Sequence, residues 1–332
     1  MTAMTRFAVI GAGGWGTAMA VIAHEAGHEV TLLGRDPDHI RSFRKTRINR
    51  PFLPGCKIPA EILVTCDAAE ALADADQVLS VIPSSYLRKT WKQLAPLVPA
   101  GVPICSLTKG IENKTFMRPT EIISEYAPGH PVSALSGPSH AEEVARLMPT
   151  TVTVAAKSPA LARKLQDLLS TESFRVYTNR DLVGVELGGA IKNVIALAAG
   201  IVDGLGFGDN TKSALLTRGL HEIIAFGKAL GARPKTFYGL AGIGDLITTA
   251  FSPHGRNRAV GERIGRGEKL KDILASTPKV AEGVPTTRSV HAQSIKLGIE
   301  MPIATEVYRV LFRNKDPRRA VTALMTRRGR TE

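Results

Sequence analysis

The sequence predicts an α/β domain with a largely parallel sheet over residues 1–180 and an all-helical domain over residues 181–332. The length of 332 residues corresponds to about two domains. Up to about residue 178, short β-branched runs alternate with segments of helical apolar spacing, which is typical of β-α-β units with helices on both faces of a sheet. Beyond residue 181 only helical spacing remains, and Gly and Pro separate the segments.

The individual elements follow from these patterns. Runs rich in Val, Ile, Leu and Thr predict strands over 7–10, 29–33, 62–65, 78–82, 102–107, 132–135, 151–155 and 175–177. Apolar residues at helical spacing predict intervening helices such as 15–26, 86–94 and 159–169, and five later helices over 183–202, 213–230, 257–264, 286–297 and 304–312. The C-terminal charge run predicts a solvated, partly frayed tail containing Arg318, Arg319, Arg327, Arg328 and Arg330.

Composition and charge narrow the function. With 44% hydrophobic and 22% charged residues, the chain has neither a disordered nor a collagen-like composition. Lys and Arg number 43 against 30 Asp and Glu, and the net charge of +13 favours an anionic partner: nucleic acid, a membrane surface or a phosphorylated small molecule. Aromatic residues make up only 5%, a poor supply for stacking on single-stranded nucleic acid.

Cysteine usage and apolar runs bear on the compartment. Cys56, Cys66 and Cys105 form no CxxC pair and have no histidine cluster at zinc-ligand spacing, so we expect free thiols in a reducing cytoplasm and no metal. The apolar stretch 7–23 loosely resembles a signal peptide, but glycines interrupt it. No later stretch reaches the ~20 uninterrupted apolar residues of a membrane span. We therefore expect a soluble, uncleaved, cytoplasmic protein.

A glycine-rich loop follows the first predicted strand directly. Gly11, Gly13 and Gly16 form a GxGxxG pattern, with Gly14 and Trp15 inside it, at the opening of a helix. The first glycine permits a tight turn, the second lets a pyrophosphate approach the backbone, and the third allows close helix–strand packing. With a second strand ending near residue 33, this context predicts a Rossmann-type, doubly wound sheet that binds a dinucleotide.

The residues after the second strand bear on the choice of dinucleotide. An arginine there accommodates the 2′-phosphate of NADP, whereas an acidic residue binds the ribose hydroxyls of NAD. Arg35 comes first, directly after Gly34, and favours NADPH. In the alternative interpretation, Arg35 is merely exposed, Asp36 caps a helix beginning at Pro37, and NADH remains usable.

Three further segments, 106–110, 136–141 and 186–193, contain residues that a purely structural role does not explain. The first two follow strands, at the end of the sheet where ligands bind in open α/β folds. In the third, Lys192 has Gly188 and Gly189 one turn before it and Ala196 one turn after it. This small-residue face suits close approach by another domain or a ligand. Desolvation there would lower the lysine pKa from ~10.4 and make proton exchange near neutral pH feasible.

Together the motifs resemble the bacterial-type NAD(P)-dependent glycerol-3-phosphate dehydrogenases over nearly the whole chain. They are GAGGWG at 11–16, LTKGIE at 107–112, LSGPSHAEEV at 135–144, ELGGAIKNVIALAAGI at 186–201, GLAGIGDLITT at 239–249, HGRNR at 254–258 and VAEGVPT at 280–286. The resemblance implies reversible hydride transfer between NAD(P)H and dihydroxyacetone phosphate, giving sn-glycerol 3-phosphate for phospholipid synthesis. No metal is required, because hydride chemistry belongs to the nicotinamide.

The resemblance also implies a role for each matching residue. Lys192 is the general acid/base that protonates the developing alkoxide, Lys109 is a second active-site lysine, and Asp245 orients Lys192. The implied substrate contacts, besides these three, are Gly137, Ser139, Asn193, Thr249, Gly255, Arg256 and Asn257, the last two as a phosphate clamp. Many members have serine at the position of Gly255. The implied dinucleotide contacts, besides the loop glycines, are Trp15, Arg35, Lys109, Ala141, Arg256, Val280 and Glu282.

Two alternatives stay open on the sequence alone. A related two-domain ketopantoate or 3-hydroxyacid reductase would share the fold, but a non-phosphorylated acid has little use for the pair Arg256 and Asn257. A basic nucleic-acid-binding protein that has kept the fold without catalysis is supported only by the net charge. The sequence also leaves a homodimer open.

Overall fold

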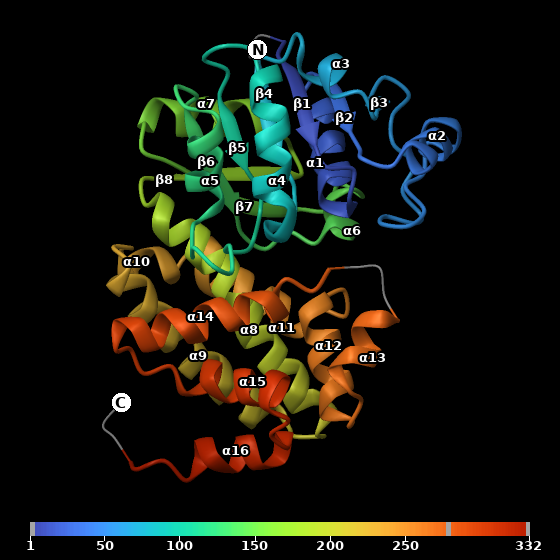
Figure 1. Ribbon diagram of the computed structural model, residues 1–332. Coiled ribbons are helices and arrows are strands. Elements are labelled where there is room, and N and C mark those ends of the chain that lie inside the picture. Colours follow the sequence, from blue (N-terminus) through green and yellow to red (C-terminus); the bar gives the residue numbers. More distant parts are fainter. Residues whose placement is uncertain (1–3, 277–279, 330–332) are drawn as a thin grey trace. The chain divides into compact units, whose positions relative to one another are not determined.

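The computed structural model describes residues 4–276 and 280–329, which divide into two compact units (Figure 1). Unit 1 comprises the chain up to Lys109 together with Met117–Glu186. Unit 2 comprises Gly110–Phe116 and the chain from Leu187 onward. The seven-residue segment between the two parts of unit 1 therefore packs with a unit whose other residues come much later in the chain.

Unit 1 is built on one eight-stranded sheet in the order β3-β2-β1-β4-β5-β6-β7-β8. Its strands are β1 (Arg6–Ile10), β2 (Glu29–Leu33), β3 (Leu63–Thr65), β4 (Gln77–Ser80), β5 (Ile104–Ser106), β6 (Val132–Ser136), β7 (Thr150–Ala156) and β8 (Phe174–Asn179). All neighbours pair in parallel except β6 and β7, which are antiparallel. The order of the first six strands is that of a Rossmann sheet, so the predicted fold class is confirmed.

Helices cover both faces of this sheet, because successive side chains of a strand point in opposite directions. Phe7 and Val9 of β1 join one core with the helices α1 (Gly14–Glu25), α2 (Pro37–Thr46) and α7 (Pro159–Leu169). Ala8 and Ile10 join the other with α3 (Ala68–Leu72), α4 (Ser84–Leu94) and α5 (Pro119–Tyr126). Figure 1 shows α4 and α5 in front of the sheet. The short elements η1 (Ala95–Leu97) and α6 (Ala141–Val144) complete the unit.

Unit 2 is helical and is organised around α8 (Leu182–Gly204), whose residues from Leu187 onward belong to it. This helix is long and apolar enough to cross a membrane, but its apolar window is entirely buried inside the structure, as in the core helix of a globular domain. The remaining elements are α9 (Asp209–Ala229), α10 (Pro234–Phe237), the π-helical turn η2 (Leu240–Gly244), α11 (Asp245–Phe251), α12 (Arg256–Gly265), α13 (Leu270–Ala275), α14 (Gly283–Leu297), α15 (Pro302–Arg313) and α16 (Pro317–Met325).

The C-terminal segment differs from its prediction. Arg318 and Arg319 lie in the helix α16, where the Asp316 side chain accepts a hydrogen bond from the Arg319 amide and Pro317 occupies the first turn. An aspartate cap followed by proline is a helix-start pattern that outweighs the charge run. Arg327 and Arg328 follow the helix and are exposed, and Arg330 lies outside the described residues.

Candidate active site

The glycine-rich loop of unit 1 joins β1 to α1 in a conformation that only small residues allow. Gly11 has φ +117°, and a Cβ at Gly16 would lie 1.9 Å from the Gly11 carbonyl oxygen. The fully buried Asn49 donates hydrogen bonds to the Ala12 carbonyl (3.1 Å) and the Thr17 hydroxyl (2.7 Å). Asn49 therefore fixes the loop from the side, although no motif in the sequence pointed to it.

The loop fits the pyrophosphate of a dinucleotide. Gly13 caps α1 with extended backbone and no side-chain cap, and the first turn contains no acidic residue. A Cβ at Gly13 would meet nothing within 4 Å, so the space over the helix start is open. The first-turn amides and the helix dipole face that space. The buried indole nitrogen of Trp15 has no hydrogen-bond partner among the described residues. Ala141 lies beside the loop, since its Cβ would be 3.5 Å from a Cβ at Gly14.

After β2, Arg35 and Asp36 have separate positions. Asp36 caps α2 by accepting hydrogen bonds from the amides of Asp38 (3.0 Å) and His39 (3.2 Å), as the alternative interpretation of this segment expects. Arg35 is exposed, and its guanidinium carbon lies 5.7 Å from the centroid of the Tyr86 ring. Sequence reasoning did not identify Tyr86, because nothing in the chain links the start of α4 to the end of β2.

A second group in unit 1 lies just beyond the carboxyl ends of β5 and β6. Lys109 Nζ donates hydrogen bonds to the Gly137 carbonyl (2.8 Å) and to Ser139 Oγ (3.0 Å). Gly137 has φ +140°, a conformation that side chains rarely adopt. The structure thus brings together Lys109, Gly137 and Ser139, three of the residues expected at the substrate.

In unit 2, Lys192 is buried at 4% exposure in the middle of α8. Its ammonium donates hydrogen bonds to Asp245 Oδ1 and, over 2.6 Å, to Thr249 Oγ1. Thr249 in turn donates to the Asp245 backbone carbonyl (2.7 Å). A carboxylate and a hydroxyl compensate the buried positive charge, which would otherwise be costly.

The small-residue face of α8 explains how Asp245 reaches this lysine. A Cβ at Gly188 would lie 2.4 Å from the Ala241 carbonyl oxygen, so only glycine admits the turn η2 at this distance. Asp245 follows that turn directly, as the first residue of α11. The sequence suggested another domain or a ligand at this face, whereas at Gly188 the structure places a turn of unit 2 itself, the one that delivers the lysine's partner.

The residues expected to clamp phosphate begin α12. Asn257 donates a hydrogen bond to Asn193 Oδ1 (2.9 Å) and accepts one from the amide of Gly283 (2.9 Å), the residue after Glu282. Gly255 is the cap residue of α12. Arg256 is exposed, and its guanidinium donates to the Val280 carbonyl over 3.3 Å.

Asp203 anchors the same helix start and was not identified from the sequence. Its carboxylate accepts hydrogen bonds from Arg258 (2.6 Å) and from Lys212 (2.9 Å). Arg258 follows the clamp residues Arg256 and Asn257 directly on α12. The bridge therefore connects α8, α9 and α12 next to the clamp. A lone aspartate in the last turn of a helix has no pattern that would reveal this role.

The described residues contain no group of three or more His, Cys, Asp or Glu side chains arranged to hold a metal ion. A Rossmann unit with an open glycine loop and a helical unit with a buried lysine–aspartate pair define the class of two-domain, dinucleotide-dependent dehydrogenases.

Family comparisons specify this class further. The N-terminal model of the NAD-dependent glycerol-3-phosphate dehydrogenases matches residues 6–162, and the C-terminal model matches residues 181–322. The chain belongs to this family. It is 50% identical over 330 residues to a glycerol-3-phosphate dehydrogenase (NAD(P)+) of Citrifermentans bemidjiense, covering 98% of each chain.

Solved structures agree with the family assignment. The chain superimposes on a glycerol-3-phosphate dehydrogenase of Coxiella burnetii with a TM-score of 0.94 at 35% identity, over 98% of this chain and 99% of that one. A ketopantoate reductase from Ralstonia eutropha aligns with a TM-score of 0.63 at 18% identity, covering 95% and 99% of the two chains. The second likeness shows the fold alone.

Proposed function

We propose that this chain catalyses reversible hydride transfer between NAD(P)H and dihydroxyacetone phosphate, giving sn-glycerol 3-phosphate. The observation that carries the proposal is the buried group of Lys192, Asp245 and Thr249, in a chain whose two halves both match the family. The nicotinamide supplies the hydride when it is bound. Lys192 gives a proton to the oxygen that changes from carbonyl to alcohol, while Asp245 and Thr249 hold its Nζ in position.

The other candidate residues bind and orient. The amides at the start of α1 suit the dinucleotide pyrophosphate, and Lys109, held by Gly137 and Ser139, is a hydrogen-bond donor for the substrate oxygen. Arg256 makes a single 3.3 Å hydrogen bond to a carbonyl among the described residues, which leaves most of its planar fork for a phosphate. Asn257, the next residue along α12, is hydrogen-bonded to Asn193, which links both expected substrate residues to the start of this helix.

Both dinucleotides are usable in this proposal, and NADPH is preferred. The Asp36 carboxylate accepts hydrogen bonds from two backbone amides as the cap of α2, which supports a structural role for it and not ribose recognition. Arg35 is exposed beside Tyr86, where its guanidinium can pair with a 2′-phosphate.

The deciding experiment is dihydroxyacetone phosphate reduction measured with NADH and NADPH side by side, with 2-ketoacids as control substrates. We expect turnover with dihydroxyacetone phosphate and a higher kcat/KM for NADPH. Oxidation of NAD(P)H by 2-ketoacids without turnover of dihydroxyacetone phosphate would favour the related-reductase alternative and overturn the proposal.

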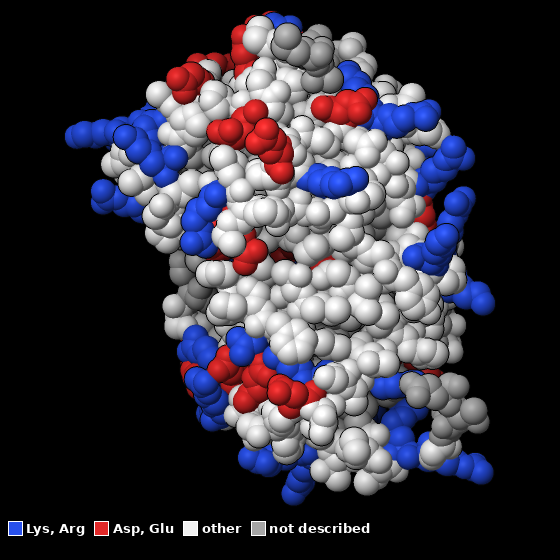
Figure 2. All heavy atoms as spheres, turned by 180° about the vertical axis from the view of Figure 1, so that it is seen from behind, with Lys and Arg blue, Asp and Glu red and all other residues white. Residues whose placement is uncertain are grey.

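We also propose a cytoplasmic enzyme that supplies glycerol 3-phosphate to phospholipid synthesis, and a homodimer remains a prediction that sedimentation velocity can test. On the face drawn in Figure 2, Lys and Arg occur as separate groups interspersed with Asp and Glu, which does not favour the nucleic-acid alternative. Tight, steeply salt-dependent binding to duplex DNA without dehydrogenase activity would support that alternative instead.

A further inference from the structure

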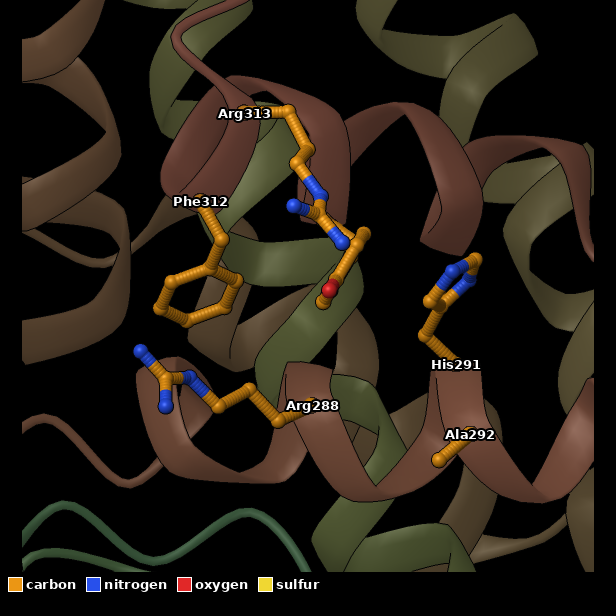
Figure 3. A pocket seen from close by; sticks show the side chains of 6 residues that line it. Arg288, His291, Ala292, Phe312 and Arg313 are labelled. Atoms are coloured by element: carbon orange, nitrogen blue, oxygen red, sulfur yellow. The ribbon is translucent and has the colours of Figure 1, made fainter.

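Unit 2 has a hollow of about 410 Å³ between α14 and α15, lined by none of the residues assigned above (Figure 3). In Figure 3, Arg288 and His291 reach it from α14 and Arg313 from α15, and the ring of Phe312 lies between the two arginines. The lining residues are Arg288, His291, Ala292, Tyr308, Phe312 and Arg313.

The hollow has uncompensated positive charge. Arg288 and Arg313 are both exposed, and within the described residues neither forms an ion pair with a carboxylate. Their neighbours differ, since Arg309 and Lys315 share the carboxylate of Glu306 at 2.7 and 2.6 Å. Two guanidinium groups from two helices therefore face one small space without a counter-charge.

Aromatic rings hold these guanidinium groups in place. The guanidinium carbon of Arg288 lies 4.2 Å from the Phe312 centroid, and that of Arg313 lies 5.9 Å from the Tyr308 centroid. Tyr308 also stacks on His291, with centroids 4.0 Å apart. Such contacts reduce the conformational entropy that the arginines would lose on binding a ligand. Because Arg288 and His291 already cover ring faces, the hollow favours a small anion over a stacking nucleobase.

His291 lies close to the positive charge of α15. Its Nδ1 is buried and has no hydrogen-bond partner among the described residues. Burial lowers the pKa of His291, and the positive charges of Arg309 and Arg313 lower it further. An anion in the hollow would oppose that second effect and give the ring nitrogen a charged neighbour.

We propose that this hollow is a binding site for a phosphate group, either free or as a small phosphomonoester, held by Arg288 and Arg313. A guanidinium binds two oxygens of one anion through parallel N–H groups. A tetrahedral phosphate dianion offers more than one such edge, so it can satisfy two forks that come from different helices. A planar carboxylate offers only one edge with two oxygens, so it can pair with only one of the two forks in this bidentate way.

The test follows the His291 ring resonances by NMR, assigned with His291→Gln, while inorganic phosphate or methyl phosphate replaces chloride at constant ionic strength. We expect a saturable shift with at least one of the two ligands. The ligand that binds more tightly shows whether the site prefers the free anion or the ester. Replacing both arginines (Arg288→Gln with Arg313→Gln) should raise the half-saturation concentration at least tenfold. The control Arg319→Gln removes an exposed arginine of α16 that does not line the hollow and should change it less than twofold.

Arg256→Gln separates this site from the substrate clamp, because it should leave the His291 response unchanged. An absent or non-saturable shift, an unchanged half-saturation concentration in the double variant, or loss of the response in Arg256→Gln would each overturn the proposal. If the double variant does not fold, the single variants Arg288→Lys and Arg313→Lys are used instead. Each keeps the positive charge at its position but lacks the planar guanidinium group. Each should then weaken binding at least threefold, and unchanged binding in both would equally reject the site.

Discussion

The two units are built to meet negative charge in different ways. Unit 1 presents backbone amides at a glycine-rich loop, so its requirement is the absence of a Cβ at Gly13 and Gly16. Unit 2 presents a buried lysine, whose requirement is a partner, Asp245, to keep the charge stable when no ligand is present. Substitutions should therefore act through backbone geometry in unit 1 and through charge pairing in unit 2.

The largest expected effect tests the buried lysine. Lys192→Ala should lower kcat by ~10²–10⁴-fold, the usual contribution of a positioned acid/base, while dinucleotide binding persists because the glycine loop lies in unit 1. Steady-state kinetics and cofactor titration by fluorescence measure the two properties.

A matched control is Lys212→Ala, which removes another buried lysine of unit 2 that is paired with an aspartate, Asp203. This control should reduce stability more than turnover. Near-normal kcat in Lys192→Ala, or an equal loss of kcat in both variants, would contradict the acid/base role.

The second effect tests the backbone geometry of unit 1. A Cβ at Gly16 would lie 1.9 Å from the Gly11 carbonyl oxygen, so Gly16→Ala should displace the loop and reduce both the melting temperature and dinucleotide affinity, the affinity by ~10²-fold or more. Gly13→Ala adds a methyl group where nothing lies within 4 Å, so it should leave the melting temperature unchanged and weaken only dinucleotide binding. Equal melting temperatures of the two variants would refute the geometric account.

The sequence predicted local features of both units better than long-range ones. All eight strands have a counterpart in the sheet, because each is a short β-branched run whose pattern is contained in its own residues. The antiparallel direction of β7 was not specified, since periodicity does not encode strand direction. Asn49 contacts a loop 37 residues earlier, which no local pattern shows.

The same distinction applies to the candidate sites. The motif containing Lys192 was recognisable as a whole, but its burial and its bond to Asp245, 53 residues away, required the fold. The Asp316–Pro317 helix start is visible in the sequence, but the charge run that follows it favours a frayed tail, and the helix start determines the structure.

A third prediction concerns the exposed charge of unit 2. Arg256→Ala should lower kcat/KM for dihydroxyacetone phosphate by ~10²-fold, equivalent to a few kcal/mol, because a charge-assisted contact to phosphate is lost. The control Arg266→Ala removes an exposed arginine at the other end of α12, paired with Glu262, and should have little effect. Unchanged kcat/KM in Arg256→Ala would remove this residue from the clamp.

A fourth prediction compares two buried glutamates, Glu186 in unit 1 and Glu222 in unit 2. Glu186 in unit 1 accepts hydrogen bonds from the Thr120 amide (2.8 Å) and from Arg118 (2.6 Å). Glu222 in unit 2 accepts them from the amides of Ile303 (2.7 Å) and Ala304 (3.2 Å), with no ion pair among the described residues. Burial raises the pKa of Glu222 to about 7.

Because the folded-state pKa lies above the unfolded value, the protonated carboxyl stabilises unit 2 at low pH. That stability is fully present below about pH 4.5 and is lost as the pH rises through about 7, by up to ~3 kcal/mol. Urea unfolding of unit 2 between pH 5 and 8 measures this loss, and Glu222→Gln should flatten the slope. A wild-type slope of the opposite sign would contradict the pKa shift.

The smallest effect tests the exposed charge of unit 1. Arg35→Ser should lower kcat/KM for NADPH by about tenfold, or ~1.4 kcal/mol, and leave NADH nearly unchanged, because only NADPH presents a 2′-phosphate to this side chain. Arg35 is exposed, so salt should also weaken the NADPH preference of the wild-type enzyme. Tyr86→Leu removes the ring beside the guanidinium without changing charge, and its smaller effect would separate orientation from charge. Equal losses with both cofactors in Arg35→Ser would instead place the arginine against the part that NADH and NADPH share, and unit 1 would then have no side-chain charge that distinguishes them at this position.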